Sequence, residues 1–160
     1  MMRIGAVSDT HGDVSAAVAA VRQMGDVAMV LHAGDHYRDG RELARRVSVP
    51  VRMVVGNCDL QVPGPAELVI EAEGARILLT HGHNYRVKHR LDTLAYRARE
   101  LGVSAVVFGH THTAEDFSEE GILFVNPGCL SFTRSRDGRR TFAVIEIAGG
   151  KCRAAISELA

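Results

Sequence analysis

Short apolar runs, each followed within a few residues by a polar side chain, recur along the first two thirds of this chain. Such runs predict buried strands, and α/β proteins place their chemistry just beyond the carboxyl ends of such strands. The arrangement occurs five times, at residues 4–7, 27–31, 51–55, 77–79 and 103–108. We therefore expect five segments that are distant in sequence to bring their polar residues to one place.

The polar residues that follow these runs are of types that bind transition metals. They are four histidines, two aspartates and one asparagine: Asp9, His11, Asp35, Asn57, His81, His110 and His112. Imidazole and carboxylate together suit Mn, Fe, Zn, Co or Ni, and the absence of a Cys-x-x-Cys pair argues against a structural zinc site. Seven ligands are too many for one tetrahedral ion. They fit two ions of higher coordination number that share a bridging carboxylate.

The order of the remaining patterns predicts an α/β protein with two kinds of sheet connection. In the first half, a helical face that begins at Val14 and a shorter helix at 41–47 alternate with the strands, which predicts parallel strands with crossovers. Strands at 68–72 and 76–79 flank a turn and predict a hairpin, and a helix at 91–101 ends at Gly102. Beyond residue 112 we expect antiparallel strands at 122–125, 141–147 and 152–156.

Length and charge narrow the class of protein further. The 160 residues fit one domain, residues 1–160, and Lys plus Arg equal Asp plus Glu at 19 each, so no protein-wide basic surface for nucleic acid is expected. No apolar run approaches the length of a membrane span, and three cysteines without scaffold spacing fit reduced thiols. We expect a soluble cytoplasmic protein, and a homo-oligomer is left open.

Five blocks in a fixed order resemble the calcineurin-like metallophosphoesterases, and specifically their small single-domain YfcE-type phosphodiesterase branch. The blocks are Asp9-Thr10-His11, Gly34-Asp35, Gly56-Asn57, His81-Gly82-His83 and Gly109-His110-Thr111-His112. The resemblance implies a four-layer α/β/β/α sandwich of two mixed sheets with the metals at the strand ends. By position it implies that Asp9, His11 and His112 hold one ion, that Asn57, His81 and His110 hold the other, and that Asp35 bridges them.

The resemblance also implies a dinuclear-metal-dependent phosphoesterase. We expect a phosphodiesterase that hydrolyses a small-molecule or nucleotide phosphodiester by in-line attack of a metal-bridging hydroxide. The cofactors are expected to be two divalent transition-metal ions, manganese first, with Fe, Zn, Ni or Co as alternatives. Asn57 is expected both to bind one ion and to touch a phosphoryl oxygen.

One position departs from the wider superfamily, in which many members carry a histidine directly after the asparagine. That histidine can protonate the leaving oxygen, whereas this chain has Cys58 there and then Asp59. A thiol is a poor substitute for that acid, and Asp59 would need a much raised pKa. His83 and His36 are the other candidates for the acid, and His83 is also a candidate for a phosphate contact.

Two other functions remain open at the level of sequence. The chain could be a non-catalytic metal-binding scaffold of the same fold, as in the retromer subunit that resembles this family, or a phosphomonoesterase with the same centre. All seven ligand positions are filled here, which favours an enzyme over a scaffold. His32, at the end of the second predicted strand, is expected to be a buried histidine outside the ligand set.

Overall fold

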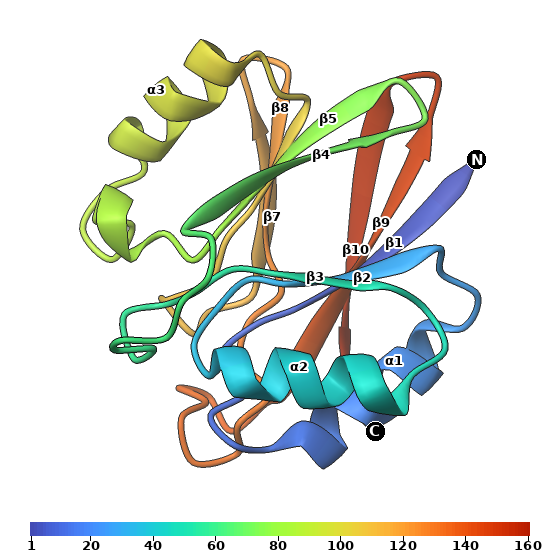
Figure 1. Cartoon of the computed structure of the whole chain (residues 1–160). Helices are drawn as coiled ribbons and strands as arrows, with labels where there is room; N and C mark the ends of the chain where they lie inside the picture. Colours follow the sequence, from blue (N-terminus) through green and yellow to red (C-terminus); the bar gives the residue numbers. More distant parts are fainter.

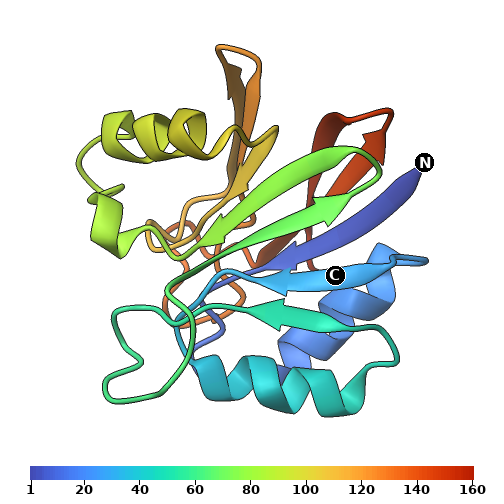
Figure 2. The ribbon, with the colours of Figure 1, turned by 45° about the horizontal axis from the view of Figure 1, so that its top comes forward.

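Two five-stranded sheets face each other, and helices cover their outer faces (Figures 1 and 2). This computed structural model describes all residues, 1–160. Helices α1 and α2 lie on the outer side of one sheet, and α3 lies on the outer side of the other. The four-layer α/β/β/α sandwich of two mixed sheets is therefore confirmed.

The first sheet has the strand order β10-β9-β1-β2-β3. Strands β1, β2 and β3, which run from the centre of the sheet to one edge, are parallel to one another. Strands β9 and β10 are antiparallel to their neighbours. The crossovers that join the parallel strands contain α1 and α2, as expected for right-handed βαβ units. The elements are β1 (Met2–Val7), α1 (Val14–Met24), β2 (Met29–His32), α2 (Tyr37–Arg46), β3 (Val51–Met53), β9 (Thr141–Ala148) and β10 (Lys151–Glu158).

The second sheet has the strand order β4-β5-β6-β8-β7. Strands β4 and β5 form the expected hairpin, and β5, β6 and β8 run parallel. None of the helices has the length and apolar composition that crossing a membrane requires. The elements are β4 (Glu67–Ala72), β5 (Ala75–Thr80), the 3₁₀ turn η1 (His83–Tyr85), α3 (Asp92–Leu101), β6 (Ala105–Val107), β7 (Glu115–Glu119) and β8 (Ile122–Asn126).

Three apolar clusters separate the four layers. The central cluster lies between the sheets and combines Ile4, Leu31 and Ile145 of the first sheet with residues such as Ile77 and Val125 of the second. A second cluster packs α1 and α2 against the first sheet, and a third packs α3 against the second sheet. Because both sheets are buried on their inner and outer faces, their parallel strands are continuous apolar runs.

The structure corrects the expected arrangement beyond residue 112. Strand β8 pairs in parallel with β6, and the antiparallel partner of β8 is β7, which was not expected. The chain leaves β6, passes the neighbouring position to form β7 at the sheet edge, and returns as β8 between the two. The sequence of β7 is polar because an edge strand faces water, so it has no apolar run to indicate it. In addition, α2 begins at Tyr37, four residues before the expected start.

Candidate metal centre

The candidate ligands lie at one edge of the sandwich, at the carboxyl ends of strands of both sheets. Asp9 and His11 follow β1, Asp35 follows β2, His81 follows β5, and His110 and His112 follow β6. They form two groups, and within each group the ligand atoms lie within 4.8 Å of one another. One group is Asp9, His11, Asp35 and His112, and the other is Asp35, His81 and His110. Asp35 is common to both groups.

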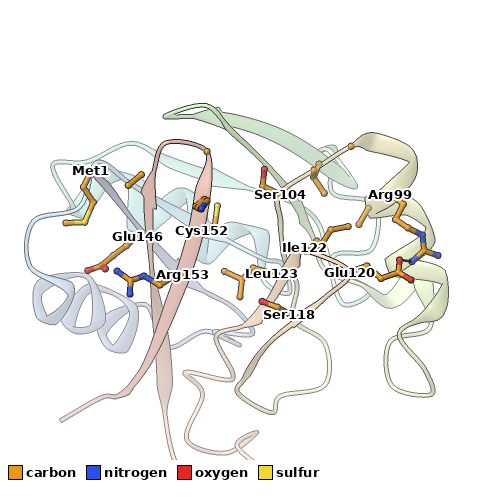
Figure 3. Close-up of a pocket in the computed structure, with 17 residues that line it drawn as sticks. Met1, Arg99, Ser104, Ser118, Glu120, Ile122, Leu123, Glu146, Cys152 and Arg153 are labelled. Atoms are coloured by element: carbon orange, nitrogen blue, oxygen red, sulfur yellow. Dashed lines mark hydrogen bonds and ion pairs between the residues drawn. The ribbon is translucent and has the colours of Figure 1, made fainter.

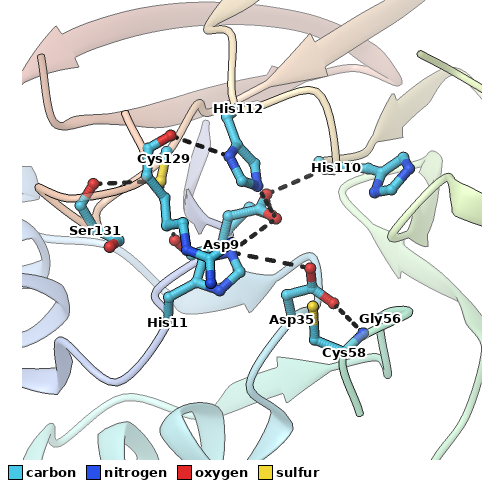
Figure 4. Close-up of polar contacts among 12 residues, drawn as sticks. Asp9, His11, Asp35, Gly56, Cys58, His110, His112, Cys129 and Ser131 are labelled. Carbon is cyan, nitrogen blue, oxygen red and sulfur yellow. Dashed lines mark hydrogen bonds and ion pairs between the residues drawn. The ribbon is translucent and has the colours of Figure 1, made fainter. Parts of the chain in front are cut away.

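The Asp9 carboxylate divides its two oxygens between the protein and the centre (Figure 4). Oδ2 accepts hydrogen bonds from the Ser8 hydroxyl (2.5 Å) and the His110 backbone N–H (3.1 Å). Oδ1 has no hydrogen-bond partner although it is buried, and it lies 3.2 Å from Nε2 of His112 and 3.9 Å from Nε2 of His81. The protein thus fixes one oxygen and leaves the other directed at the imidazoles.

Asp35 is divided in the same way. Its Oδ1 accepts a hydrogen bond from the Cys58 backbone N–H (2.9 Å), which connects it to the loop after β3. Its Oδ2 lies 3.3 Å from Nε2 of His81 and 4.0 Å from Nε2 of His11. Because His11 and His81 belong to different groups, this oxygen faces both.

Backbone carbonyls orient two of the imidazole rings. Nδ1 of His81 donates to the Ala33 carbonyl oxygen (2.9 Å), and Nδ1 of His112 donates to the Arg134 carbonyl oxygen (3.1 Å). With the proton of Nδ1 committed to a carbonyl, the lone pair that remains for a metal is the one on Nε2. In both residues Nε2 is the nitrogen that faces the carboxylates.

The buried polar atoms at this place fit metal ions. Of the three buried side-chain polar atoms without a hydrogen-bond partner, two are Asp9 Oδ1 and His11 Nε2, which lie 3.8 Å apart. Leaving such atoms unpaired costs about 1–3 kcal/mol each, so a native protein retains them only for a ligand or a strained functional role. Two carboxylates and four imidazoles are donors of the types that Mn, Fe, Zn, Co and Ni accept.

Strained backbone accompanies the candidate ligands. Five of them have left-handed φ values that glycine adopts readily but other residues rarely do. Such conformations cost on the order of 1–3 kcal/mol each and concentrate at functional sites. The five are Asp9 (54°), His11 (43°), Asp35 (55°), His110 (71°) and His112 (61°).

The carboxylates are held in their charged form. Burial disfavours the charge on Asp9, but the nearby imidazoles of His112 and His81, together with the hydrogen bond from the Ser8 hydroxyl, outweigh burial and lower the pKa of Asp9. Burial likewise opposes ionisation of Asp35, while His81 and the Cys58 N–H lower its pKa well below the ordinary range. Both groups are therefore anionic at neutral pH.

The imidazoles respond differently to the same surroundings. Burial lowers the pKa of His11, and burial together with the neighbouring His81 lowers the pKa of His110 to about 4. Burial also opposes a charge on His81, but Asp35 and Asp9 outweigh it and raise the pKa of His81. In the metal-free protein the proton on Nε2 of His81 is thus stabilised between carboxylate oxygens.

The remaining predicted site residues lie around this centre. Asn57 Oδ1 is 3.1 Å from Nε2 of His81, which places the amide beside the second group. The His83 ring centroid is 5.3 Å from that of His81, and its buried Nδ1 has no hydrogen-bond partner. The His36 ring is 4.9 Å from that of His11. The Cys58 thiol is beside Asp35, and burial and that carboxylate raise its pKa to about 11.

Asp59 does not have the freedom that an acid catalyst needs. Its Oδ1 accepts from the Tyr37 N–H and its Oδ2 from the Gly56 N–H, both at 2.8 Å. Oδ1 of Asp59 therefore fastens the loop after β3 to the start of α2, and Oδ2 holds the turn within that loop. The contacts of Ala33 and Arg134 could not be found from the sequence, because each joins a backbone carbonyl to a histidine that is distant in sequence. The contact of Ser8 with the adjacent Asp9 depends on how the loop after β1 folds.

A large cavity lies away from the candidate metal centre (Figure 3). It has a volume of about 950 Å³ and lies between the β9–β10 hairpin, the turn before β8 and the end of α3. Ser104 and Lys151, which line it, lie at the start of β6 and β10, whereas the candidate ligands follow the carboxyl ends of their strands. No candidate ligand lines this cavity, so it is separate from the candidate metal centre.

Comparison with known proteins agrees with this centre. The family model of the calcineurin-like phosphoesterase superfamily domain matches residues 2–150. A probable metallophosphoesterase, YsnB, of Bacillus subtilis is 35% identical over 136 residues, covering 84% of this chain and 79% of its own. A probable metallophosphoesterase of Methanothermobacter thermautotrophicus is 33% identical over 162 residues, covering 97% and 91%. The resemblance that the five sequence blocks indicate is confirmed.

Solved structures share the fold over nearly the whole chain. A predicted phosphoesterase from Streptococcus pneumoniae has a TM-score of 0.78 and 28% identity, covering 98% of both chains. Vps29 from Entamoeba histolytica, solved with zinc, has a TM-score of 0.76 and 21% identity, covering 99% of this chain and all of its own. An archaeal phosphodiesterase has a TM-score of 0.73 and 20% identity, covering 98% and 100%. Because the sequence identities of Vps29 and of the archaeal phosphodiesterase to this chain are low, these two comparisons show a shared fold alone.

A methyl group at Gly109 is expected to disturb the Asp9 carboxylate. A Cβ there would lie 2.1 Å from the Ser8 hydroxyl and 2.6 Å from Asp9 Oδ2. Gly109→Ala should therefore weaken metal binding about 10-fold or more, as measured by calorimetric titration of metal-free protein. Gly5→Ala, in β1, is the matched control, because its Cβ would meet the flexible end of the Met24 side chain and no candidate ligand. Equal metal affinity of the two variants would contradict the geometry described for Asp9.

Metal binding at the group of Asp35, His81 and His110 is expected to displace one proton. His81 has a raised pKa and holds a proton below it, whereas the pKa of about 4 leaves His110 already neutral. In a His11→Ala/His112→Ala variant, which keeps only this group complete, apparent affinity should rise about tenfold per pH unit up to the pKa of His81 and then level off. If the apparent affinity rose about a hundredfold per pH unit, which corresponds to two displaced protons, or did not change between pH 5.5 and 8, the histidine assignments would be wrong.

Proposed function

Because this chain belongs to the calcineurin-like phosphoesterase superfamily, we propose that it is a dinuclear-metal-dependent phosphodiesterase acting on a small-molecule or nucleotide phosphodiester. The observation that carries the proposal is the sharing of Asp35 by two groups of metal-binding side chains. Two ions that share a carboxylate are held close enough to act on one phosphoryl group.

This geometry supports the ligand assignment that the resemblance to the family implies. Asp9, His11 and His112 would hold one ion, Asn57, His81 and His110 would hold the other, and the Asp35 carboxylate would bridge them. We propose manganese as the metal, because these nitrogen and oxygen donors suit it, with Fe, Zn, Ni or Co as alternatives. When bound, the two ions supply a lowered pKa for a water nucleophile and neutralise charge on the phosphoryl oxygens.

The first group should bind its ion more tightly. It contains the charges of Asp9 and the shared Asp35, whereas the second group contains Asp35 and the neutral Asn57 amide. Below its raised pKa, His81 also holds a proton that competes with a cation in the second group. Because the first group has more negative charge, its affinity for a metal ion should be higher than that of the second group.

We assign His83 and Asn57 as the side chains that touch the substrate. The buried Nδ1 of His83 has no partner, and burial and the neighbouring His81 lower the pKa of His83. A mostly neutral imidazole is a hydrogen-bond donor rather than a proton source, so we assign His83 to a phosphoryl oxygen. The Cys58 thiol, with a pKa of about 11, is a poor acid as well, and we assign this residue to positioning Asp35 through its backbone N–H.

Turnover of bis-p-nitrophenyl phosphate tests the proposed function, because its leaving group needs no acid. The manganese-loaded protein should hydrolyse this diester faster than p-nitrophenyl phosphate, and Asp35→Asn should lower kcat/KM by at least about 10²-fold. Asp116→Asn, on the exposed β7 strand, is the control and should retain activity. Faster hydrolysis of the monoester would identify a phosphomonoesterase, and two bound ions without turnover would identify a scaffold.

The role of His83 predicts a particular pattern of rates. His83→Ala should slow p-nitrophenyl and alkyl phosphodiesters by the same factor, about 10- to 100-fold, because a hydrogen bond to a charged oxygen is lost in both. His83→Gln keeps an N–H donor and should recover part of the rate. A loss confined to the alkyl ester, measured on variants with unchanged metal content, would instead assign His83 as the acid for the leaving group.

A further inference from the structure

A chain of buried hydrogen bonds lies beside the candidate metal centre and has no part in the reaction proposed above. The Gly34 N–H donates to Nδ1 of His32 (3.2 Å), and Nε2 of His32 lies 3.1 Å from the Thr10 hydroxyl oxygen. The Thr10 hydroxyl donates to Oδ2 of Asp39 (2.6 Å), which also accepts from the Gly12 N–H (2.7 Å). The His32 and Thr10 residues are fully buried and Asp39 is 7% exposed.

The direction of every bond in this chain is fixed. Nδ1 of His32 accepts a hydrogen bond, so the proton of the neutral ring is on Nε2, which donates to Thr10. Thr10 accepts from His32 and uses its own proton for the Asp39 carboxylate. Burial lowers the pKa of His32, in accord with a neutral ring. The donor and the acceptor of each hydrogen bond among His32, Thr10 and Asp39 are thus determined.

This chain of hydrogen bonds joins the loop that contains Asp9 to the loop that contains Asp35. Thr10 lies between Asp9 and His11, and Gly34 immediately precedes Asp35. All three candidate ligands have left-handed backbone, which is unfavourable for these residues. Asp9 and Asp35 are also like charges at close range, so in the metal-free state the loops would relax apart unless other contacts held them.

We infer that His32, Thr10 and Asp39 are positioning residues that hold the Asp9–His11 and Asp35 loops in their metal-binding conformation before metal binds. The inference rests on the proposed function for its ligand assignment. The three residues belong to β2, the loop after β1, and α2, so the hydrogen bonds tie both ligand loops to packed elements. Outer contacts of this kind typically change metal affinity by about 10- to 100-fold.

Two variants of Thr10 separate the hydroxyl from the shape of the side chain. Thr10→Val keeps the branched shape and removes both hydrogen bonds, whereas Thr10→Ser keeps the hydroxyl. In calorimetric titrations of metal-free protein with Mn²⁺, Thr10→Val should bind the tighter ion about 10- to 100-fold more weakly, and Thr10→Ser should stay within a few-fold of wild type. Wild-type affinity in Thr10→Val, or equal losses in both variants, would overturn the inference.

A second measurement does not depend on any variant folding. In the metal-free wild-type protein, ¹⁵N NMR should show His32 as the neutral ring with its proton on Nε2, and a proton on Nδ1 would overturn the inference. If Thr10→Val does not fold, Asp39→Ala, which removes the acceptor of the Thr10 and Gly12 hydrogen bonds, replaces it in the titration, and unchanged affinity there also overturns the inference. Because neither readout uses turnover, a protein that binds two ions as expected but lacks activity contradicts the proposed function and leaves the positioning role supported.

Discussion

Two buried carboxylates at the same edge of the sandwich impose the main constraint on this structure. Asp9 and Asp35 each give one oxygen to backbone N–H groups and direct the other at imidazoles from the opposite sheet. Burying two like charges is costly unless cations compensate them. In the metal-free protein, below the raised pKa of His81, a proton on its Nε2 supplies part of that compensation between the carboxylates, where a metal would bind. Metal binding exchanges this proton for divalent charge.

The layered packing makes this convergence possible. The central apolar cluster holds the two sheets face to face, so that the ends of β1 and β2 in one sheet meet the ends of β5 and β6 in the other. Neither sheet alone contains a complete group, because the carboxylates come from the first sheet and His81 and His110 from the second. The fold and the metal centre are therefore coupled: a displacement between the sheets would separate the donors.

How far the sequence predicts the fold and the candidate site depends on whether a feature rests on a local pattern or on contacts between distant residues. The runs before Asp9, Asp35 and His110 predict their strands because burial on both faces leaves a continuous apolar signal. Strand β7 gave no such signal because it lies at a polar sheet edge, and the parallel placement of β8 depends on where the chain crosses, which no local pattern specifies. The ligand types were predictable because each follows a strand. The hydrogen bonds of Ser8, Thr10 and Asp39 were not, since they depend on contacts that form only in the folded chain.

A crystal structure of the manganese-loaded protein tests the bridging role proposed for Asp35 most directly. Anomalous scattering at the manganese edge should give two peaks about 3.5–4 Å apart, with one oxygen or both oxygens of Asp35 within coordination distance of both. His11 and His112 should contact one peak, and His81 and His110 the other. A single peak, or two peaks of which Asp35 contacts only one, would contradict the central claim.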